Sequence, residues 1–288
     1  MEEIEMKKYL ICVDSDGCVF DSMELKHKEC FCPAFVNVWG LQNVSRYARE
    51  VWDYVNLYSK TRGINRFPAL VLALELLDTR PEVRERGYVC PDLTALKKWI
   101  NETDKLSAAG LSEYCAQNPD SDPILQNALK WSKEVDENIE RIVHGVIALP
   151  GVKDAFEAFS SFADIMIVSA TPQEAIVREW GAQGLLEYVT VVAGQEMGTK
   201  KVCIAKALED GKYDLNHVLM IGDAPGDYAA AQANGVLYYP IVPGKEVKSW
   251  KRIKDEALAR FKKIAYEGNY MEALLEEFDC VLLDKPAW

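Results

Sequence analysis

Two aspartates near the start of the chain, Asp14 and Asp16, have the type and spacing for carboxylate chemistry. Residues two apart in extended chain project to the same side, and Gly17 then allows the backbone to turn sharply. Carboxylates this close repel each other, so we expect a compensating cation, either a hard oxygen-seeking ion such as Mg²⁺ or a lysine. Without one, a carboxyl group would stay protonated. The structural alternative is that both aspartates are turn and cap residues.

Further polar side chains occur where later apolar runs end. Ser169 closes the run at 163–169, and its hydroxyl could donate to a phosphoryl oxygen. Asp223 and Asp227 follow the run at 217–222. Either could merely cap the next helix, and Asp227 could cap it as well as serve a site. Four carboxylates at one edge of a sheet would be hard to tolerate without a bound divalent cation.

Two adjacent lysines open the helix predicted at 201–208. The positive end of the helix dipole disfavours a cation there by roughly 0.3 to 1 kcal/mol. Lys200 or Lys201 is therefore locally misplaced unless it faces an anion. We prefer Lys200 because it directly follows the predicted cap residue, Thr199.

A capping motif follows Ser169. The sequence Thr171-Pro172-Gln173-Glu174 combines a hydroxyl residue, a proline in the first turn and an acidic residue three positions after the hydroxyl. This is the pattern of a capping box, so we predict that the Thr171 hydroxyl caps the helix that begins here.

Short apolar runs must position these groups. Residues 9–13 predict a fully buried strand because the run is too short for a helix and shows no polar alternation. Four later runs alternate with helical patterns, which predicts a doubly wound parallel sheet, a Rossmann-like α/β fold with helices on both faces. The later strands are expected at 163–169, 189–193, 217–222 and 236–239, and the helices at 173–180, 201–208 and 228–234. The loops at the carboxyl ends of such strands open on one edge, so the candidate residues should converge there.

A block of helical patterns interrupts this fold after Ser22. Apolar residues recur at three- and four-residue intervals over 24–39, 45–58, 67–77, 92–101, 107–117 and 123–143. Residues 22–145 carry 16 Lys+Arg against 18 Asp+Glu, while the rest of the chain carries 17 against 27. We therefore predict an all-helical cap domain at 23–145, inserted into a core domain of 1–22 and 146–288, with two tail helices at 247–266 and 270–278 on the core.

Composition limits the functional classes. The chain has 288 residues, 49% hydrophobic and 27% charged, and we expect a globular protein with no membrane segment because no apolar run approaches 18 residues. A net charge of -12 makes nucleic acid an unfavourable partner. The N-terminus lacks the form of a signal peptide, and eight scattered cysteines without a CxxC pair indicate reduced thiols in a cytoplasmic protein. A metal role for Cys30 and Cys32 is disfavoured, since the chain has three histidines and no second cysteine pair.

The candidate residues together resemble the motifs of a known family. Four elements occur in order: Asp14-Ser-Asp16-Gly, an apolar strand ending in Ser169, Lys200 or Lys201, and Gly222-Asp223-x-x-x-Asp227. This order is similar to the four motifs of the haloacid dehalogenase superfamily, and the helical block resembles the C1 cap of that family. Two features depart from the family pattern: no proline follows the lysine, and the cap is unusually long.

The resemblance implies a Mg²⁺-dependent phosphohydrolase that acts on a small phosphorylated metabolite. Asp14 would be the nucleophile that forms an aspartyl-phosphate, and Asp16 would be the general acid and then the base for water. Asp14, the main-chain carbonyl of Asp16 and Asp223 would hold Mg²⁺, with Asp227 supporting them from outside. Ser169 and the lysine would neutralise the transferring phosphoryl oxygens.

Other functions are compatible with some of these residues. Dehalogenases of the same superfamily lack the second aspartate, so Asp16 argues against them. A phosphomutase would keep all four motifs and protect the aspartyl-phosphate from water. A phosphate-ligand binding protein that has lost turnover is an alternative from a different class.

The cap sequence also contains one strongly cationic stretch. Residues 60–67, Lys60-Thr61-Arg62-Gly63-Ile64-Asn65-Arg66-Phe67, contain Lys60, Arg62 and Arg66 and no acidic residue. Arg62 or Arg66 could grip a second anionic group on the substrate, since a guanidinium binds anions bidentately. The alternative is a solvated loop between two helices.

Overall fold

The computed structural model describes residues 7–288, and the chain forms two compact units. The core unit comprises Met1–Ser22 and Val146–Val281, and the cap unit comprises Met23–Gly145 and Leu282–Trp288. The division differs from the prediction at the C-terminus, because the sequence analysis places 282–288 in the core. The reason is backbone pairing: Leu283 N–H donates to the carbonyl of Tyr58 (2.8 Å), and Lys60 N–H donates to the carbonyl of Leu283 (3.2 Å).

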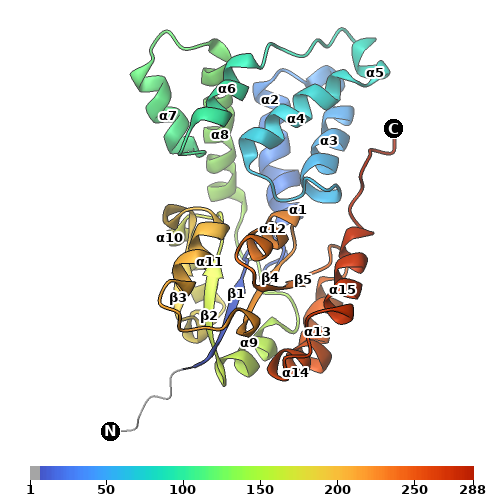
Figure 1. The fold of residues 1–288 in the computed structure, drawn as a ribbon. Coiled ribbons are helices and arrows are strands. Elements are labelled where there is room, and N and C mark those ends of the chain that lie inside the picture. Colours follow the sequence, from blue (N-terminus) through green and yellow to red (C-terminus); the bar gives the residue numbers. More distant parts are fainter. Residues whose placement is uncertain (1–6) are drawn as a thin grey trace. The chain divides into compact units, whose positions relative to one another are not determined.

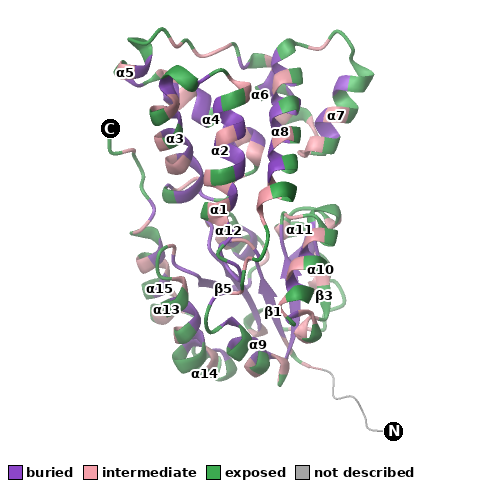
Figure 2. Cartoon of the chain, turned by 180° about the vertical axis from the view of Figure 1, so that it is seen from behind, coloured by how far each residue is buried: buried purple, intermediate pink, exposed green. Residues whose placement is uncertain are grey.

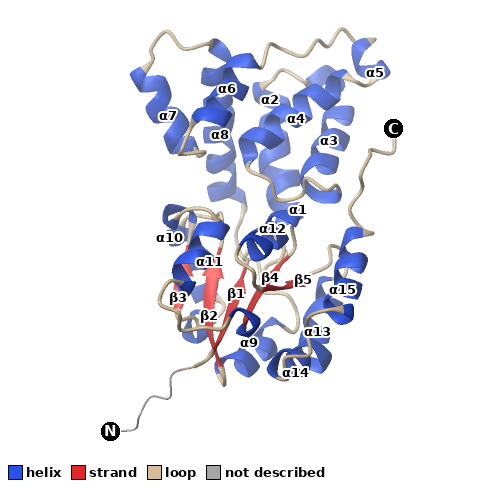
Figure 3. Ribbon diagram, viewed as in Figure 1, coloured by secondary structure: helices blue, strands red, loops and turns tan. Residues whose placement is uncertain are grey.

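The core unit is built on a five-stranded parallel sheet (Figures 1 and 3). The strands are β1 (Tyr9–Val13), β2 (Ala163–Val168), β3 (Val191–Ala193), β4 (Val218–Gly222) and β5 (Leu237–Pro240). Their order is β3-β2-β1-β4-β5. The predicted α/β fold is confirmed, and β1 is central because it pairs with both β2 and β4. The topological switch point of the sheet therefore lies at the carboxyl end of β1.

Alternate residues of each strand contact opposite layers of helices. Ile11 and Val13 pack in a cluster with residues of the helices α9 (Val152–Ser160), α10 (Gln173–Ala182) and α13 (Glu246–Arg252). Leu10 and Cys12 pack in a second cluster with α11 (Lys200–Leu208) and α12 (Pro225–Ala233). Strands β1, β2, β4 and β5 are buried along nearly their whole length (Figure 2), which explains why their sequences lack polar alternation, whereas the edge strand β3 is buried only at Ala193. This parity also assigns Asp14, the next residue after Val13, to the side of α11 and α12.

The core helices overlap the predicted ranges, although the stretch predicted at 247–266 ends at Lys262 and the helix predicted at 228–234 begins at Pro225. They are α9 (Val152–Ser160), α10 (Gln173–Ala182), α11 (Lys200–Leu208), α12 (Pro225–Ala233), α13 (Glu246–Arg252), α14 (Leu258–Lys262) and α15 (Asn269–Asp279). A π-helical turn at Ile253–Ala257 joins α13 to α14. Helix α9 was not predicted, although Val152, Phe156 and Phe159 recur at helical spacing and are all buried.

The cap unit is all-helical, as predicted. Its helices are α1 (Met23–Leu25), α2 (Cys32–Val38), α3 (Ser45–Asp53), α4 (Arg66–Asp78), α5 (Pro81–Arg84), α6 (Thr94–Glu102), α7 (Ala108–Gln117) and α8 (Pro123–Ile142). The cap has its own buried cluster, centred on Phe35, Trp52, Phe67 and Trp131. A π-helical turn at Lys26–Phe31 leads into α2 just before Pro33, whose ring removes a backbone donor.

Two global properties follow from the described residues. Across 7–288, no helix combines the length and apolarity needed to cross a bilayer. All eight cysteines carry free thiols. The signal-peptide prediction concerns mainly residues 1–6, which lie outside the described residues.

Candidate active site

The turn after β1 presents the first two aspartates. Asp14 continues the strand, and its N–H donates to the carbonyl of Ile221 on β4 (2.9 Å). Gly17 has a positive φ of 75°, which closes a tight loop in which Gly17 N–H donates to the carbonyl of Phe20 (2.8 Å). The glycine therefore has the turning role that its position predicts.

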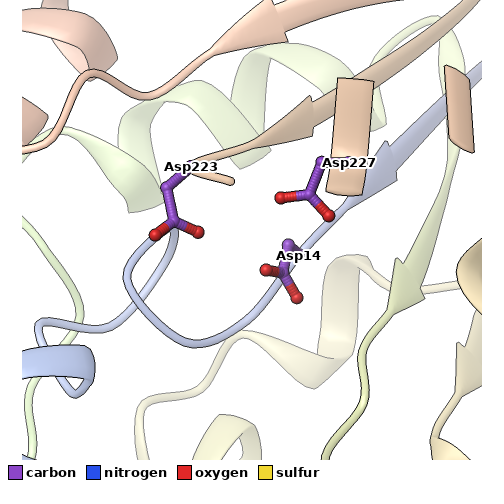
Figure 4. Close-up of side chains that lie close together, drawn as sticks. All are labelled: Asp14, Asp223 and Asp227. Carbon is purple, nitrogen blue, oxygen red and sulfur yellow. The ribbon is translucent and has the colours of Figure 1, made fainter. Parts of the chain in front are cut away.

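The end of β4 brings two more aspartates to Asp14. Asp14, Asp223 and Asp227 are buried, and each offers a carboxylate oxygen within 4.8 Å of the others (Figure 4). Asp223 directly follows β4, and Asp227 lies in the first turn of α12, where its Oδ2 accepts the N–H of Ala224 (3.1 Å). Gly222 permits this approach, since a Cβ at that position would collide with the Asp227 carboxylate.

Lys200 supplies the positive charge nearest to this cluster. Its Nζ lies 2.8 Å from Asp14 Oδ2 and 2.5 Å from Asp227 Oδ1. Lys201, the next residue, is exposed. The Thr199 hydroxyl accepts the N–H of Val202 (3.3 Å), so Thr199 is the helix cap that the sequence predicts. The two carboxylates therefore offset the unfavourable interaction of the Lys200 ammonium with the helix dipole.

The carboxylates of the cluster outnumber the positive charges next to them. Burial raises the pKa of the Asp14 carboxyl well above its ordinary value, Asp227 and Asp223 raise it further, and Lys200 opposes them. Burial lowers the pKa of Lys200, but attraction to Asp14 and Asp227 outweighs burial and the net shift is upward. One ammonium faces three carboxylates, so a further cation would be stabilised here.

Two hydroxyl groups donate hydrogen bonds to the Asp16 carboxylate. The Ser22 hydroxyl donates to Asp16 Oδ1, and the Thr171 hydroxyl donates to Asp16 Oδ2 (2.9 Å). The prediction that Thr171 caps the next helix is wrong. Helix α10 begins at Gln173, with Pro172 at the cap position and no side-chain cap from the chain before it. The Glu196 carboxylate accepts the Gln173 N–H instead (3.0 Å), so the cap comes from a residue distant in sequence.

Ser169 lies directly after β2 on the same edge of the sheet. Its N–H donates to the carbonyl of Ala193 on β3 (3.0 Å), and its buried Oγ accepts the N–H of Thr171 (3.2 Å). A serine hydroxyl has one donor hydrogen and separate lone pairs that accept. Because the Thr171 N–H uses a lone pair of Ser169 Oγ, the hydroxyl hydrogen can still be donated to a substrate oxygen.

Both predicted substrate-binding arginines belong to the cap unit. Arg62 is buried, and its Nη1 donates to the carbonyl of Leu57 (2.9 Å). Arg66 is the first residue of α4, and its Nη1 donates to Ser132 Oγ (3.0 Å) and Asp136 Oδ1 (2.7 Å). These contacts are internal to the cap, and a role in substrate binding stays a prediction for both residues.

Comparison with known proteins gives the family. The sequence profile of the family described as haloacid dehalogenase-like hydrolase matches residues 87–239, slightly more than half of the chain. This segment contains Ser169, Lys200, Asp223 and Asp227 and begins after the first motif. The chain therefore belongs to the haloacid dehalogenase-like hydrolases. No curated protein matches the chain.

Solved structures of low sequence identity are also similar to this chain. A predicted phosphoglycolate phosphatase from Haemophilus somnus is 13% identical, with a TM-score of 0.50 and coverage of 83% of this chain and 86% of that chain. A hydrolase from Pseudomonas syringae is 16% identical, with a TM-score of 0.47 and coverage of 85% and 90%. A haloacid dehalogenase-like family protein from Streptococcus pneumoniae is 14% identical, with a TM-score of 0.43 and coverage of 84% and 90%.

Proposed function

We propose that this protein is a Mg²⁺-dependent phosphohydrolase that acts on a small phosphorylated metabolite. The observation that carries the proposal is the surroundings of Asp14: a buried carboxylate at the switch point of the sheet, paired with Lys200 and adjacent to Asp223. Family membership supports a hydrolase, and the second aspartate, Asp16, favours phosphate esters over carbon-halogen substrates.

The proposed reaction has two chemical steps. In the first, an oxygen of Asp14 attacks phosphorus, the bond from phosphorus to the ester oxygen breaks, and the leaving oxygen takes the proton of Asp16. In the second, Asp16 takes a proton from water, the resulting hydroxide attacks phosphorus, and inorganic phosphate leaves Asp14. Lys200 and Ser169 would stabilise the negative charge on the transferring oxygens throughout.

The residues present fit a hard divalent cation. Three buried carboxylates with one lysine retain net negative charge, and carboxylate oxygens are the ligands that Mg²⁺ prefers. We assign Asp14, the main-chain carbonyl of Asp16 and Asp223 as ligands. Asp227 supports them from outside, because its two oxygens are engaged by Lys200 and by Ala224 N–H. When bound, Mg²⁺ would supply positive charge to the transferring phosphoryl group.

The experiment is release of inorganic phosphate from p-nitrophenyl phosphate and from a panel of phosphorylated metabolites, with and without Mg²⁺. We expect Mg²⁺-dependent release, and we expect Asp14→Asn to reduce it to the background rate with an unchanged far-UV spectrum. Near-normal turnover by Asp14→Asn would refute the nucleophile assignment. Transfer of the phosphoryl group to a second position of the substrate, without release, would refute the hydrolase.

A further inference from the structure

Two buried tryptophans donate hydrogen bonds to the loop that carries the predicted nucleophile. Trp180 Nε1, from α10, donates to Ser15 Oγ (3.0 Å), and Trp250 Nε1, from α13, donates to the carbonyl of Cys18 (2.8 Å). Both tryptophans, together with Ser15 and Cys18, have no exposed surface. Neither tryptophan belongs to the four family motifs described in the sequence analysis.

The two indole rings are held in place by close aromatic packing. The Phe156 ring on α9 lies 5.5 Å from that of Trp180 and 6.1 Å from that of Trp250. The Phe20 ring also packs edge to face against that of Trp180, with the ring centroids 5.8 Å apart. Gly151 has a positive φ of 93° and lets the chain pass close to Trp250, since a Cβ there would lie 3.3 Å from that of the tryptophan. Both donors therefore project from one rigid layer under the sheet.

The bonded atoms are well placed to orient the carboxylates. Ser15 lies between Asp14 and Asp16, and it shares the parity of Ile11 and Val13, which face the layer containing Trp180. Anchoring Ser15 toward that layer turns Asp14 to the opposite side, toward Lys200. The main-chain carbonyl of Ser15 also accepts the N–H groups of Val19 and Phe20 (2.9 and 3.1 Å). Hydrogen bonds therefore fix both the side chain and the backbone of Ser15.

We propose that Trp180 is a positioning residue for the nucleophile. Its indole N–H, acting through Ser15, sets the direction in which Asp14 projects, while Trp250 holds the far side of the loop through the Cys18 carbonyl. The inference rests on the proposed function for its effect on catalysis. A displacement of about 1 Å at a reacting group costs on the order of 100-fold in rate, so loss of one anchor should reduce turnover measurably.

The test compares tryptophan-to-phenylalanine variants, in which a smaller ring without an N–H donor replaces the indole. Trp180→Phe and Ser15→Ala each break the same hydrogen bond, and Trp131→Phe in the cap is the matched control. Trp131 is equally buried, and its Nε1 has no hydrogen-bond partner among the residues the structure describes. The size change is the same in both tryptophan variants, so loss of packing is common to them.

We expect Trp180→Phe and Ser15→Ala to lower kcat for p-nitrophenyl phosphate about 10-fold, with a smaller change in KM. The double variant should be no slower than either single variant, because both remove one interaction. Trp131→Phe should retain wild-type kcat at a similar cost in Tm. Equal kcat losses in Trp180→Phe and Trp131→Phe, or unchanged kcat in Ser15→Ala, would overturn the proposal.

A second readout separates this inference from the proposed function. Mg²⁺ affinity is measured by calorimetry without substrate, and we expect it to fall several-fold in Trp180→Phe and Ser15→Ala but not in Trp131→Phe. If the wild type releases no phosphate and this pattern still holds, the positioning role stands and the proposed function fails. If Mg²⁺ affinity is the same in all variants, Trp180 does not position Asp14.

Discussion

Replacing Lys200 by methionine should destabilise the metal-free protein strongly. The side chain of Lys200 is 21% exposed, and its two partners, Asp14 and Asp227, are 9% and 0% exposed. Methionine keeps most of the apolar stem but removes the ammonium, which leaves three carboxylates together in a buried site. Removing one partner of a buried ion pair costs about 3 to 5 kcal/mol, because the remaining charge is uncompensated.

For a unit of this size, each kcal/mol lowers Tm by about 2 to 4 °C, so Lys200→Met should lower Tm by about 10 °C in the presence of a chelator. Excess Mg²⁺ should raise the Tm of Lys200→Met by more degrees than that of the wild type, since it returns a cation to the cluster. The assay is thermal unfolding followed by circular dichroism at constant pH.

Lys201→Met is the matched control for this variant. It makes the same chemical change one residue away, on an exposed side chain, and should alter the free energy of unfolding by no more than about 0.5 kcal/mol. If Lys200→Met and Lys201→Met unfold at the same temperature in chelator, the ion pairs at Lys200 do not carry the stability that their burial implies.

Three further predictions concern catalysis. A chelator should stop phosphate release, and Asp223→Ala should raise the Mg²⁺ concentration needed for half-maximal rate. Full activity in chelator would show that the carboxylate cluster needs no metal. Arg62→Ala or Arg66→Ala should raise KM for a phosphorylated metabolite with a second anionic group and barely affect KM for p-nitrophenyl phosphate. Equal effects on both substrates would show that these arginines have a structural role only. Thr171→Val removes one of the two hydroxyl donors to Asp16, so kcat should fall more for an alkyl phosphate, whose leaving oxygen needs a proton, than for p-nitrophenyl phosphate. Equal losses on the two esters would show that Thr171 does not act through the general acid.

Much of the core could be predicted from local patterns. The apolar run before Asp14 is a central strand, and Thr199 caps the helix that Lys200 begins. These features are predictable because short-range chemistry decides them: strand burial removes polar alternation, and a cap needs a side-chain oxygen a few residues from the N–H it accepts. The parallel topology then follows from the alternation of strands with helices.

Other features were decided by residues far apart in sequence. Thr171 has the local pattern of a cap, yet Glu196 caps the helix and the Thr171 hydroxyl bonds to Asp16, because the fold supplies a competing partner. The choice of Lys200 over Lys201 follows from which helix side faces Asp14. Two consecutive helical residues point about 100° apart, so their order alone cannot show which one enters the site.

The tertiary structure also decided which elements support the site. The bond from Trp180 to Ser15 spans 165 residues, and no local pattern predicts a partner at that separation. Residues 282–288 follow a helix of the core unit, but the backbone groups of Leu283 pair with Tyr58 and Lys60 of the cap unit. In both cases the sequence determined which groups could donate or accept a hydrogen bond. Only packing decided which partner came within reach, because burial removes water as the alternative partner.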